Sequence, residues 1–260
     1  MDIKSHLEAR EEQVIADPTR LLVGSLLLPT EEYSTSLSIF PGTCAYPWFN
    51  LEGEFGMTVS VFNSNSTPTV YRSEYCNEQG NIRVELDSLG IEKAPGLFRY
   101  VLIELSQTQK IPVDIYLSAV HRETGVYISY PGLVFIGDQI FSDLHSNHLE
   151  NTTFWPGLVS AGDAEVCTAI LNPYNEPFFY QIHMIHGDGV RLQSKSFKIA
   201  KKSCSFKSLK DVFGSDFLNL PPATSICITS QFKHVGYVAF RDTKAGIFTS
   251  LDHTHTYQMV

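Results

Sequence analysis

The most informative segment of the chain is Val166-Cys-Thr-Ala-Ile-Leu-Asn-Pro-Tyr-Asn-Glu-Pro177, which combines a strand-like apolar run with an Asn and Pro turn. The same form occurs in Met57-Thr-Val-Ser-Val-Phe-Asn-Ser-Asn-Ser-Thr-Pro68. Turn residues recur at a constant offset of 109 positions: Asn63 and Asn172, Pro68 and Pro177, Gly80 and Gly189. In both runs apolar residues occupy both alternating faces, which is typical of strands covered on both sides. The match predicts a tandem of two related β domains.

The rest of the chain keeps the same rhythm of short alternating runs separated by turn residues, which predicts an all-β fold of two antiparallel β-sandwiches. Two further matches support a duplication: residues 100–106 resemble 224–230 at an offset of 124, and Arg122-Glu-Thr124 resembles Arg241-Asp-Thr243 at 119. Ser5 and Glu8 form a capping-box pattern that predicts a short N-terminal helix. The expected units are therefore residues 1–20 as a helical segment, 21–150 as the first β-sandwich and 151–260 as the second.

Composition excludes several classes of protein. The chain has 260 residues, 43% apolar composition and a net charge of −9, so it can bury a core and is a poor candidate for binding nucleic acid. The first residues lack the layout of a secretion signal, and the longest apolar run, Leu21 to Leu28, is too short to be a transmembrane segment. The five cysteines include no Cys-x-x-Cys pair, which favours reduced thiols and no zinc ribbon. These features predict a cytoplasmic protein.

The segment from Arg191 to Lys210 carries seven of the 19 basic residues and no acidic residue. Lys195, Lys198, Lys201 and Lys202 lie at its centre. Clustered lysines on an acidic protein attract anions, so the segment is a candidate docking surface for an acidic protein or an anionic membrane surface. A solvated strand and loop is the alternative interpretation.

Aromatic residues beside turns are a second set of candidates, because rigid aromatic side chains dominate the energetics of interfaces. This set comprises Tyr46, Trp48, Trp155 and Tyr174, and packing in the core is the alternative interpretation. Histidines form a third set, in which His253 and His255 are expected to share one face of a strand and His145 and His148 to lie at an equivalent edge. These four could bind zinc only if the two segments meet.

Signatures of catalysis and of cofactor binding are missing from the sequence. Ser160 in Gly157-Leu-Val-Ser160-Ala-Gly162 has one residue too many before it for a nucleophile elbow, and no phosphate loop or dinucleotide fingerprint occurs. The sequence therefore predicts a protein without enzymatic activity and without a cofactor. A carbohydrate-binding or small-ligand module and a metal-dependent enzyme that uses the histidines remain as alternatives.

A family resemblance covers about one repeat at a time. Residues 165–257, with Cys167-Thr-Ala-Ile-Leu-Asn172, Glu176, the strand at 181–185, Ser208-Leu-Lys-Asp211 and Arg241-Asp242, resemble the sensory rhodopsin transducer family. The resemblance implies a small soluble β-sandwich that oligomerises and signals from a membrane photoreceptor. This chain departs from that family by its duplication, its basic insertion and its additional N-terminal segment. Together with the composition, the resemblance predicts a binding, adaptor or structural protein that acts through protein partners, in a homo-oligomer and in a signalling role.

Overall fold

The computed structural model describes residues 20–40, 53–62, 68–77, 82–107, 114–131, 133–135, 151–155, 164–172, 174–214, 217, 224–230, 234–253 and 255–256. The predicted N-terminal helix lies outside these residues. The fold is all-β, as the alternating sequence pattern predicts, and consists of four antiparallel sheets. Among the described residues, no helix has both the length and the apolar character needed to cross a membrane.

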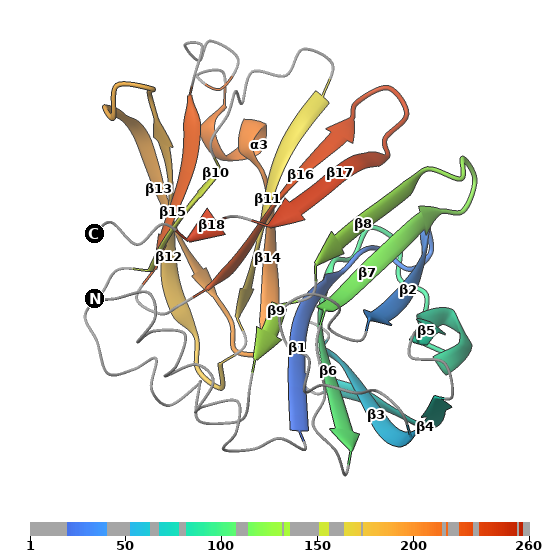
Figure 1. Cartoon of the computed structure of the whole chain (residues 1–260). Helices are drawn as coiled ribbons and strands as arrows, with labels where there is room; N and C mark the ends of the chain where they lie inside the picture. The colour runs from blue at the N-terminus through green and yellow to red at the C-terminus, as the bar shows by residue number, and fades with distance from the viewer. Residues whose placement is uncertain are drawn as a thin grey trace.

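The first half of the chain forms sheets A and B (Figure 1). Sheet A has the order β4-β3-β6-β1-β9, with β1 at Arg20–Leu27, β3 at Gly53–Phe62, β4 at Pro68–Asn77, β6 at Arg99–Gln107 and β9 at Leu133–Phe135. Sheet B has the order β5-β2-β7-β8, with β2 at Tyr33–Phe40, β5 at Ile82–Glu85, β7 at Asp114–His121 and β8 at Tyr127–Pro131. A short 3-10 helix, η1 at Leu86–Leu89, follows β5.

The second half forms sheets C and D. Sheet C has the order β13-β12-β15-β10-β18, with β10 at Asn151–Trp155, β12 at Phe178–Ile185, β13 at Arg191–Ile199, β15 at Ser225–Ser230 and β18 at His255–Thr256. Sheet D has the order β14-β11-β16-β17, with β11 at Ala164–Asn172, β14 at Ser203–Ser208, β16 at Val235–Asp242 and β17 at Phe248–His253. A five-residue helix, α3 at Leu209–Phe213, follows β14 and buries Leu209 and Phe213.

The two halves have the same strand order. If nine is subtracted from each strand number, the order of sheet C becomes that of sheet A, and the order of sheet D becomes that of sheet B. The offset of 109 residues nevertheless fails. An offset of 109 residues would make β11 the counterpart of β3. In the observed sheets, β12 is the counterpart of β3, and β11 is the counterpart of β2. Val59 and Thr168 therefore lie in non-equivalent strands, and the predicted correspondence is wrong. Asn and Pro end many strands, so their recurrence marks turns and does not identify which strand precedes them.

The segments Arg122-Glu-Thr124 and Arg241-Asp-Thr243 lie in equivalent hairpins, β7–β8 in the first half and β16–β17 in the second. The observed offset between these hairpins differs by two residues from the predicted offset of 119. Gly125 donates its amide to the His121 carbonyl at 2.9 Å, and Gly246 donates to the Asp242 carbonyl at 2.8 Å, so the equivalent positions are 121 residues apart. Both glycines have positive φ, at 73° and 70°, which other residues rarely adopt. The match between residues 100–106 and 224–230 also falls in equivalent strands, β6 and β15. The shared strand order is what a duplicated chain would have, and the duplication itself stays a prediction.

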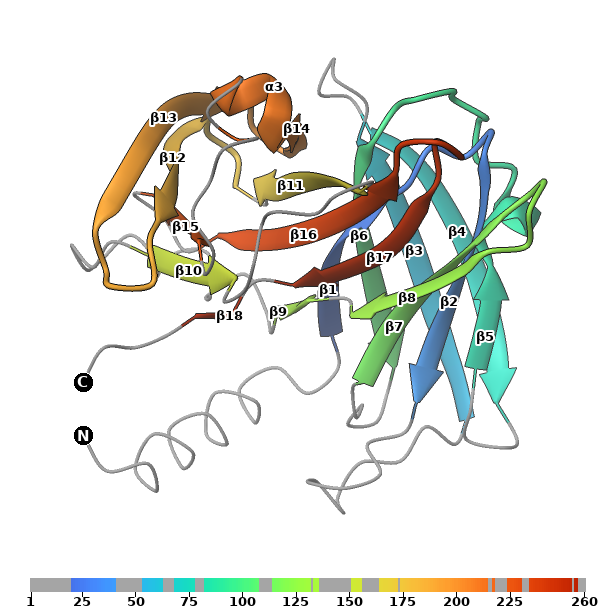
Figure 2. The same cartoon turned by 90° about the horizontal axis from the view of Figure 1, so that it is seen from above.

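Sheet D is buried on both faces, which explains the continuous apolar run in β11. Val166 and Ile170 pack in the core between sheets C and D. The alternate residues Cys167, Ala169 and Leu171 join the hydrophobic cluster of the first half. Figures 1 and 2 show sheet D in the middle of the molecule, between sheet C and the first half. The two halves therefore share a continuous interior.

Aromatic side chains contribute several contacts between the halves. Phe98 stacks on Phe206 with 3.7 Å between ring centroids, and Tyr130 meets Tyr237 edge to face at 6.1 Å. The Tyr33 hydroxyl accepts a hydrogen bond from the Phe248 amide at 2.8 Å. Stacked and edge-to-face pairs of this kind add to the energy of apolar burial.

Candidate functional site

The basic segment folds into two strands joined by a tight turn, β13 and β14, and the short helix α3 at one side of the second sandwich. β13 is the terminal strand of sheet C, and β14 is the terminal strand of sheet D on the same side. On these strands, their turn and the helix, we call the following side chains the basic surface: Arg191, Lys195, Lys198, Lys201, Lys202, Lys207 and Lys210. Arg191, Lys195, Lys198, Lys201 and Lys210 are exposed, and Lys202 and Lys207 are half-buried.

Alternation along β13 directs its lysines to both faces of the sheet edge. Lys198 pairs in register with Phe179 and holds its ammonium 5.6 Å from the centre of that exposed ring. Lys195 pairs with Ile182, on the face that continues into the sandwich, and Lys207 of β14 approaches the Phe197 ring at 5.6 Å. The described residues place no carboxylate within ion-pair distance of Lys195 or Lys198. Their positive charge is therefore available to an external anion.

The turn between β13 and β14 is tightly held, although it carries two of the four central lysines. Lys202 has a φ of 46°, in the left-handed region that non-glycine residues seldom adopt, and its amide donates to the Tyr174 carbonyl at 3.0 Å. Asn172 donates to the carbonyls of Glu176 and Ala200, both at 2.8 Å. The conformation that presents Lys201 is thus set by hydrogen bonds to the main chain, two of which are partly buried.

The two described members of the predicted aromatic set, Tyr174 and Trp155, pack in the second sandwich. Tyr174 is buried and packs edge to face on Phe178 at 6.0 Å, and burial raises the pKa of its phenol. Trp155 is half-buried and packs against the core of the second sandwich, 6.4 Å from Phe240. Tyr46 and Trp48 lie outside the described residues.

The histidine hypothesis is corrected by the topology. His253 ends β17 in sheet D, whereas His255 begins β18 in sheet C, so the two residues do not share a face of one strand. The chain changes sheet between them, which the alternating pattern does not reveal. His145 and His148 lie outside the described ranges, and within those ranges no group of three or more His, Cys, Asp or Glu residues could bind a metal ion.

Two other histidines are fixed inside sheet C by hydroxyl groups. The ring nitrogens of His183 lie 2.7 Å from Ser194 Oγ and 2.8 Å from Thr229 Oγ1. Those of His234 lie 2.8 Å from Thr153 Oγ1 and 2.9 Å from Ser230 Oγ. Both imidazoles are buried, so they cannot reach a substrate in solution. Their contacts are those of structural histidines.

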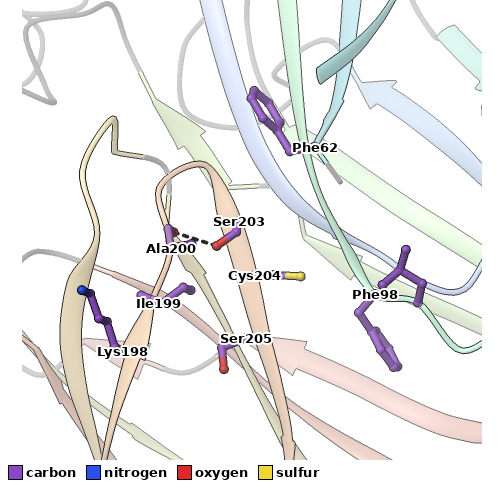
Figure 3. A pocket seen from close by; sticks show the side chains of 9 residues that line it. Phe62, Phe98, Lys198, Ile199, Ala200, Ser203, Cys204 and Ser205 are labelled. Carbon is purple, nitrogen blue, oxygen red and sulfur yellow. Dashed lines mark hydrogen bonds between the residues drawn. The ribbon is translucent and has the colours of Figure 1, made fainter. Parts of the chain in front are cut away.

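A pocket of about 240 Å³ lies where the turn between β13 and β14 meets the first half (Figure 3). Phe62, Leu97 and Phe98 form one wall, and residues 198–200 and 203–205 form the other. Figure 3 shows the Cys204 sulfur on the side toward Phe98, whereas the Lys198 side chain points away from both phenylalanines. Burial raises the pKa of the Cys204 thiol to about 12, so this group is not a nucleophile near neutral pH.

The hydroxyl groups of this pocket already have partners. Ser203 donates to the Ala200 carbonyl at 2.7 Å, and Ser205 Oγ lies 2.7 Å from the Tyr180 hydroxyl. Most of the remaining lining is apolar or main chain. The pocket therefore presents no reactive group, and the one charged residue of its lining, Lys198, points away from the phenylalanine wall.

The thiol of Cys167 provides a test of the contact between the halves. Its burial raises its pKa from 9.0 to about 12. A thiol that stays neutral in the folded protein but ionises in the unfolded chain stabilises the fold below pH 9, and this contribution is lost as the pH rises toward 12. Cys167→Ala is expected to lessen the fall in the free energy of unfolding between pH 8 and pH 10.5 by about 2 kcal/mol. Urea titrations at both pH values measure this difference, and equal falls for the two proteins would contradict the burial of the thiol.

No protein-family model and no curated protein matches the sequence. Solved structures with similarity include a β-glucuronidase from Bacteroides uniformis, at 9% identity and a TM-score of 0.24, covering 92% of this chain and 26% of that one. A putative β-galactosidase from Bacteroides fragilis has 8% identity, a TM-score of 0.25 and coverage of 91% and 32%. A glycosyl hydrolase family 2 member from Bacteroides cellulosilyticus has 7% identity, a TM-score of 0.24 and coverage of 92% and 28%. The chain thus spans about a quarter to a third of these proteins, and TM-scores this low do not establish a common fold.

Proposed function

We propose that this protein is a non-enzymatic binding protein that acts through protein–protein contacts, and that the basic surface docks an acidic protein partner. The observation that supports this proposal most directly is the exposed charge of Lys195 and Lys198 on the terminal strand of sheet C, where no carboxylate among the described residues pairs with either lysine. A terminal strand can also pair its main chain with an extended segment of a partner. The basic surface would then select acidic sequences.

The charge of the chain is divided unevenly between its halves. Residues 21–150 contain 15 acidic and 6 basic residues, whereas residues 151–260 contain 8 acidic and 10 basic residues. Such a charge distribution orients an approaching partner and accelerates association at low ionic strength. It also allows the acidic partner to be a second copy of the chain, which accords with the predicted homo-oligomer. A signalling role and a membrane photoreceptor partner rest on the family resemblance alone.

Reversal of charge at the basic surface is expected to weaken partner capture several-fold or more while changing the melting temperature by less than about 2 °C. The test compares Lys195→Glu/Lys198→Glu with the matched control Lys93→Glu/Lys244→Glu, which changes two exposed lysines elsewhere. Pull-down from native lysate measures capture, and light scattering at low and high salt measures self-association. Added salt should weaken the same interaction, because exposed charges are screened beyond about 8 Å at physiological ionic strength.

Two results would count against this function. Capture that survives both the double reversal and added salt would show that the basic surface is only solvated. Equal losses in the two double variants would show a response to net charge and not to a defined surface.

A further inference from the structure

The outer face of sheet B carries a group of serines beside two tyrosines. Alternation along β2, β7 and β8 directs Leu37, Leu117 and Ile128 into the core. The opposite positions carry five serines on one face: Ser34, Ser36, Ser38, Ser118 and Ser129. Ser36 and Ser118 are buried, whereas Ser34 and Ser38 are half-buried and Ser129 is exposed. Figures 1 and 2 show this sheet on the side of the molecule away from sheet C. Neither the basic surface nor the contact between the halves uses this face.

Tyr127 provides an exposed aromatic platform on this surface. Its side chain is 59% exposed, although its hydroxyl lies 2.8 Å from Ser118 Oγ on the neighbouring strand. In register Tyr127 faces Val120, and Ser118 faces Ser129, so the phenol reaches a diagonal neighbour. Diagonal positions are about 7–8 Å apart, a distance that a tyrosine spans only by leaning along the sheet. One face of the ring therefore covers the sheet and the other faces solvent.

A second exposed tyrosine lies on the same face. Tyr116 of β7 is 40% exposed and pairs in register with Pro131, four residues along β8 from Tyr127. Four residues of strand correspond to about 13 Å, so a ligand in contact with both rings must be longer than a single sugar.

The charge of the surface indicates what kind of ligand it fits. Arg83 and Glu85 form an ion pair at 2.8 Å on β5 and cancel one another. At its edge, Asp87 accepts a hydrogen bond from Ser34 Oγ at 2.9 Å and forms an ion pair with Arg122 at 2.6 Å, so these two charges also cancel. The other described groups on this face are hydroxyls, tyrosine rings and one aliphatic side chain. Charges that are paired in this way give no electrostatic advantage to an acidic or basic polymer, and two separate rings offer little continuous apolar area to a lipid. Paired charges, hydroxyl groups and exposed aromatic faces are complementary to a neutral oligosaccharide.

We propose that the outer face of sheet B binds a neutral, linear oligosaccharide, with sugar rings stacked on Tyr127 and Tyr116 and sugar hydroxyls bonded to Ser38 and Ser129. The weakly positive C–H face of a pyranose packs on the negative face of an aromatic ring. The hydrogen bond to Ser118 holds the Tyr127 ring in position before the ligand arrives, which lowers the entropic cost of binding. This site is independent of the basic surface, because it lies on the other half of the chain.

Titration calorimetry of the full chain with cellohexaose, maltohexaose and laminarihexaose tests the proposal. At least one of these neutral glucans is expected to bind, and Tyr127→Ala should weaken its binding by about tenfold or more. Tyr127→Phe keeps the ring but loses the bond to Ser118, so its loss should be smaller. Tyr116→Ala should weaken the hexasaccharide and leave any binding of glucose unchanged.

The matched control is Phe179→Ala, which removes an equally exposed aromatic ring, at 56%, from the second half. It should bind the glucan as the wild type does, and so should Lys195→Glu/Lys198→Glu. Melting curves of each variant establish that the fold is intact. The proposal is overturned if none of the three glucans binds, or if Tyr127→Ala binds as tightly as Phe179→Ala.

Discussion

Residues 151–260, produced without the first half, are expected to aggregate and not to fold as a soluble monomer. Removal of the first half would expose the buried outer face of sheet D, which includes Leu171, Tyr237, Phe248 and Leu251. Exposed apolar patches of this kind drive association. Size-exclusion chromatography with light scattering measures the outcome.

Co-expression of residues 1–150 with residues 151–260 provides the control, because the partner half should cover sheet D again and restore a soluble complex. A monodisperse second half with its own cooperative unfolding transition would show that sheet D does not depend on the first half. The predicted boundary near residue 150 would then separate two units that fold independently.

Tyr237→Ala is expected to lower the free energy of unfolding by roughly 3–5 kcal/mol, as the removal of a fully buried aromatic side chain does. Tyr237 lies in β16 with no exposed surface, and its ring meets Tyr130 of the first half. Its hydroxyl lies 3.4 Å from Ser25 Oγ, a long contact that contributes little. Tyr237→Phe should therefore cost only about 1 kcal/mol. Equilibrium denaturation in urea measures both values.

Phe179→Ala is the matched control for size, since its ring is mostly exposed and its removal should cost less than about 1 kcal/mol. A loss at Tyr237→Ala no greater than at Phe179→Ala would mean that the contact between the halves does not support the fold. Two separate unfolding transitions in the wild-type protein would lead to the same conclusion.

The sequence predicts the class of fold because alternation and turn residues are local signals. β11 carries apolar residues on both faces, and the structure covers both faces. The correspondence at 109 residues fails because a turn signature does not identify the strand that it ends. Strand identity depends on pairing between distant segments, as between β11 and β16, which no local pattern encodes.

The candidate sites show the same division between local and distant information. Exposure of Lys195 and Lys198 follows from their own chemistry, since lysines are seldom fully buried. Tyr174 and Tyr127 are chemically alike, yet the first is buried and the second is exposed. The signal that could have identified the second surface is the spacing of Tyr116 with Ser118 and of Tyr127 with Ser129, because residues two apart share one face of a strand.

The lysines of β13 also restrict how copies of this protein can assemble. An isologous dimer formed by antiparallel pairing of β13 with its own symmetry mate would bring each lysine near its own symmetry copy across the twofold axis, Lys195 on one face of the sheet and Lys198 on the other. Terminal strands that carry lysines resist such pairing because like charges repel across the ladder. A homo-oligomer is therefore expected to use either a different face or a heterologous contact, in which β13 meets the acidic first half of the next copy. A contact of the second kind closes into a ring or extends into a filament according to the rotation between copies.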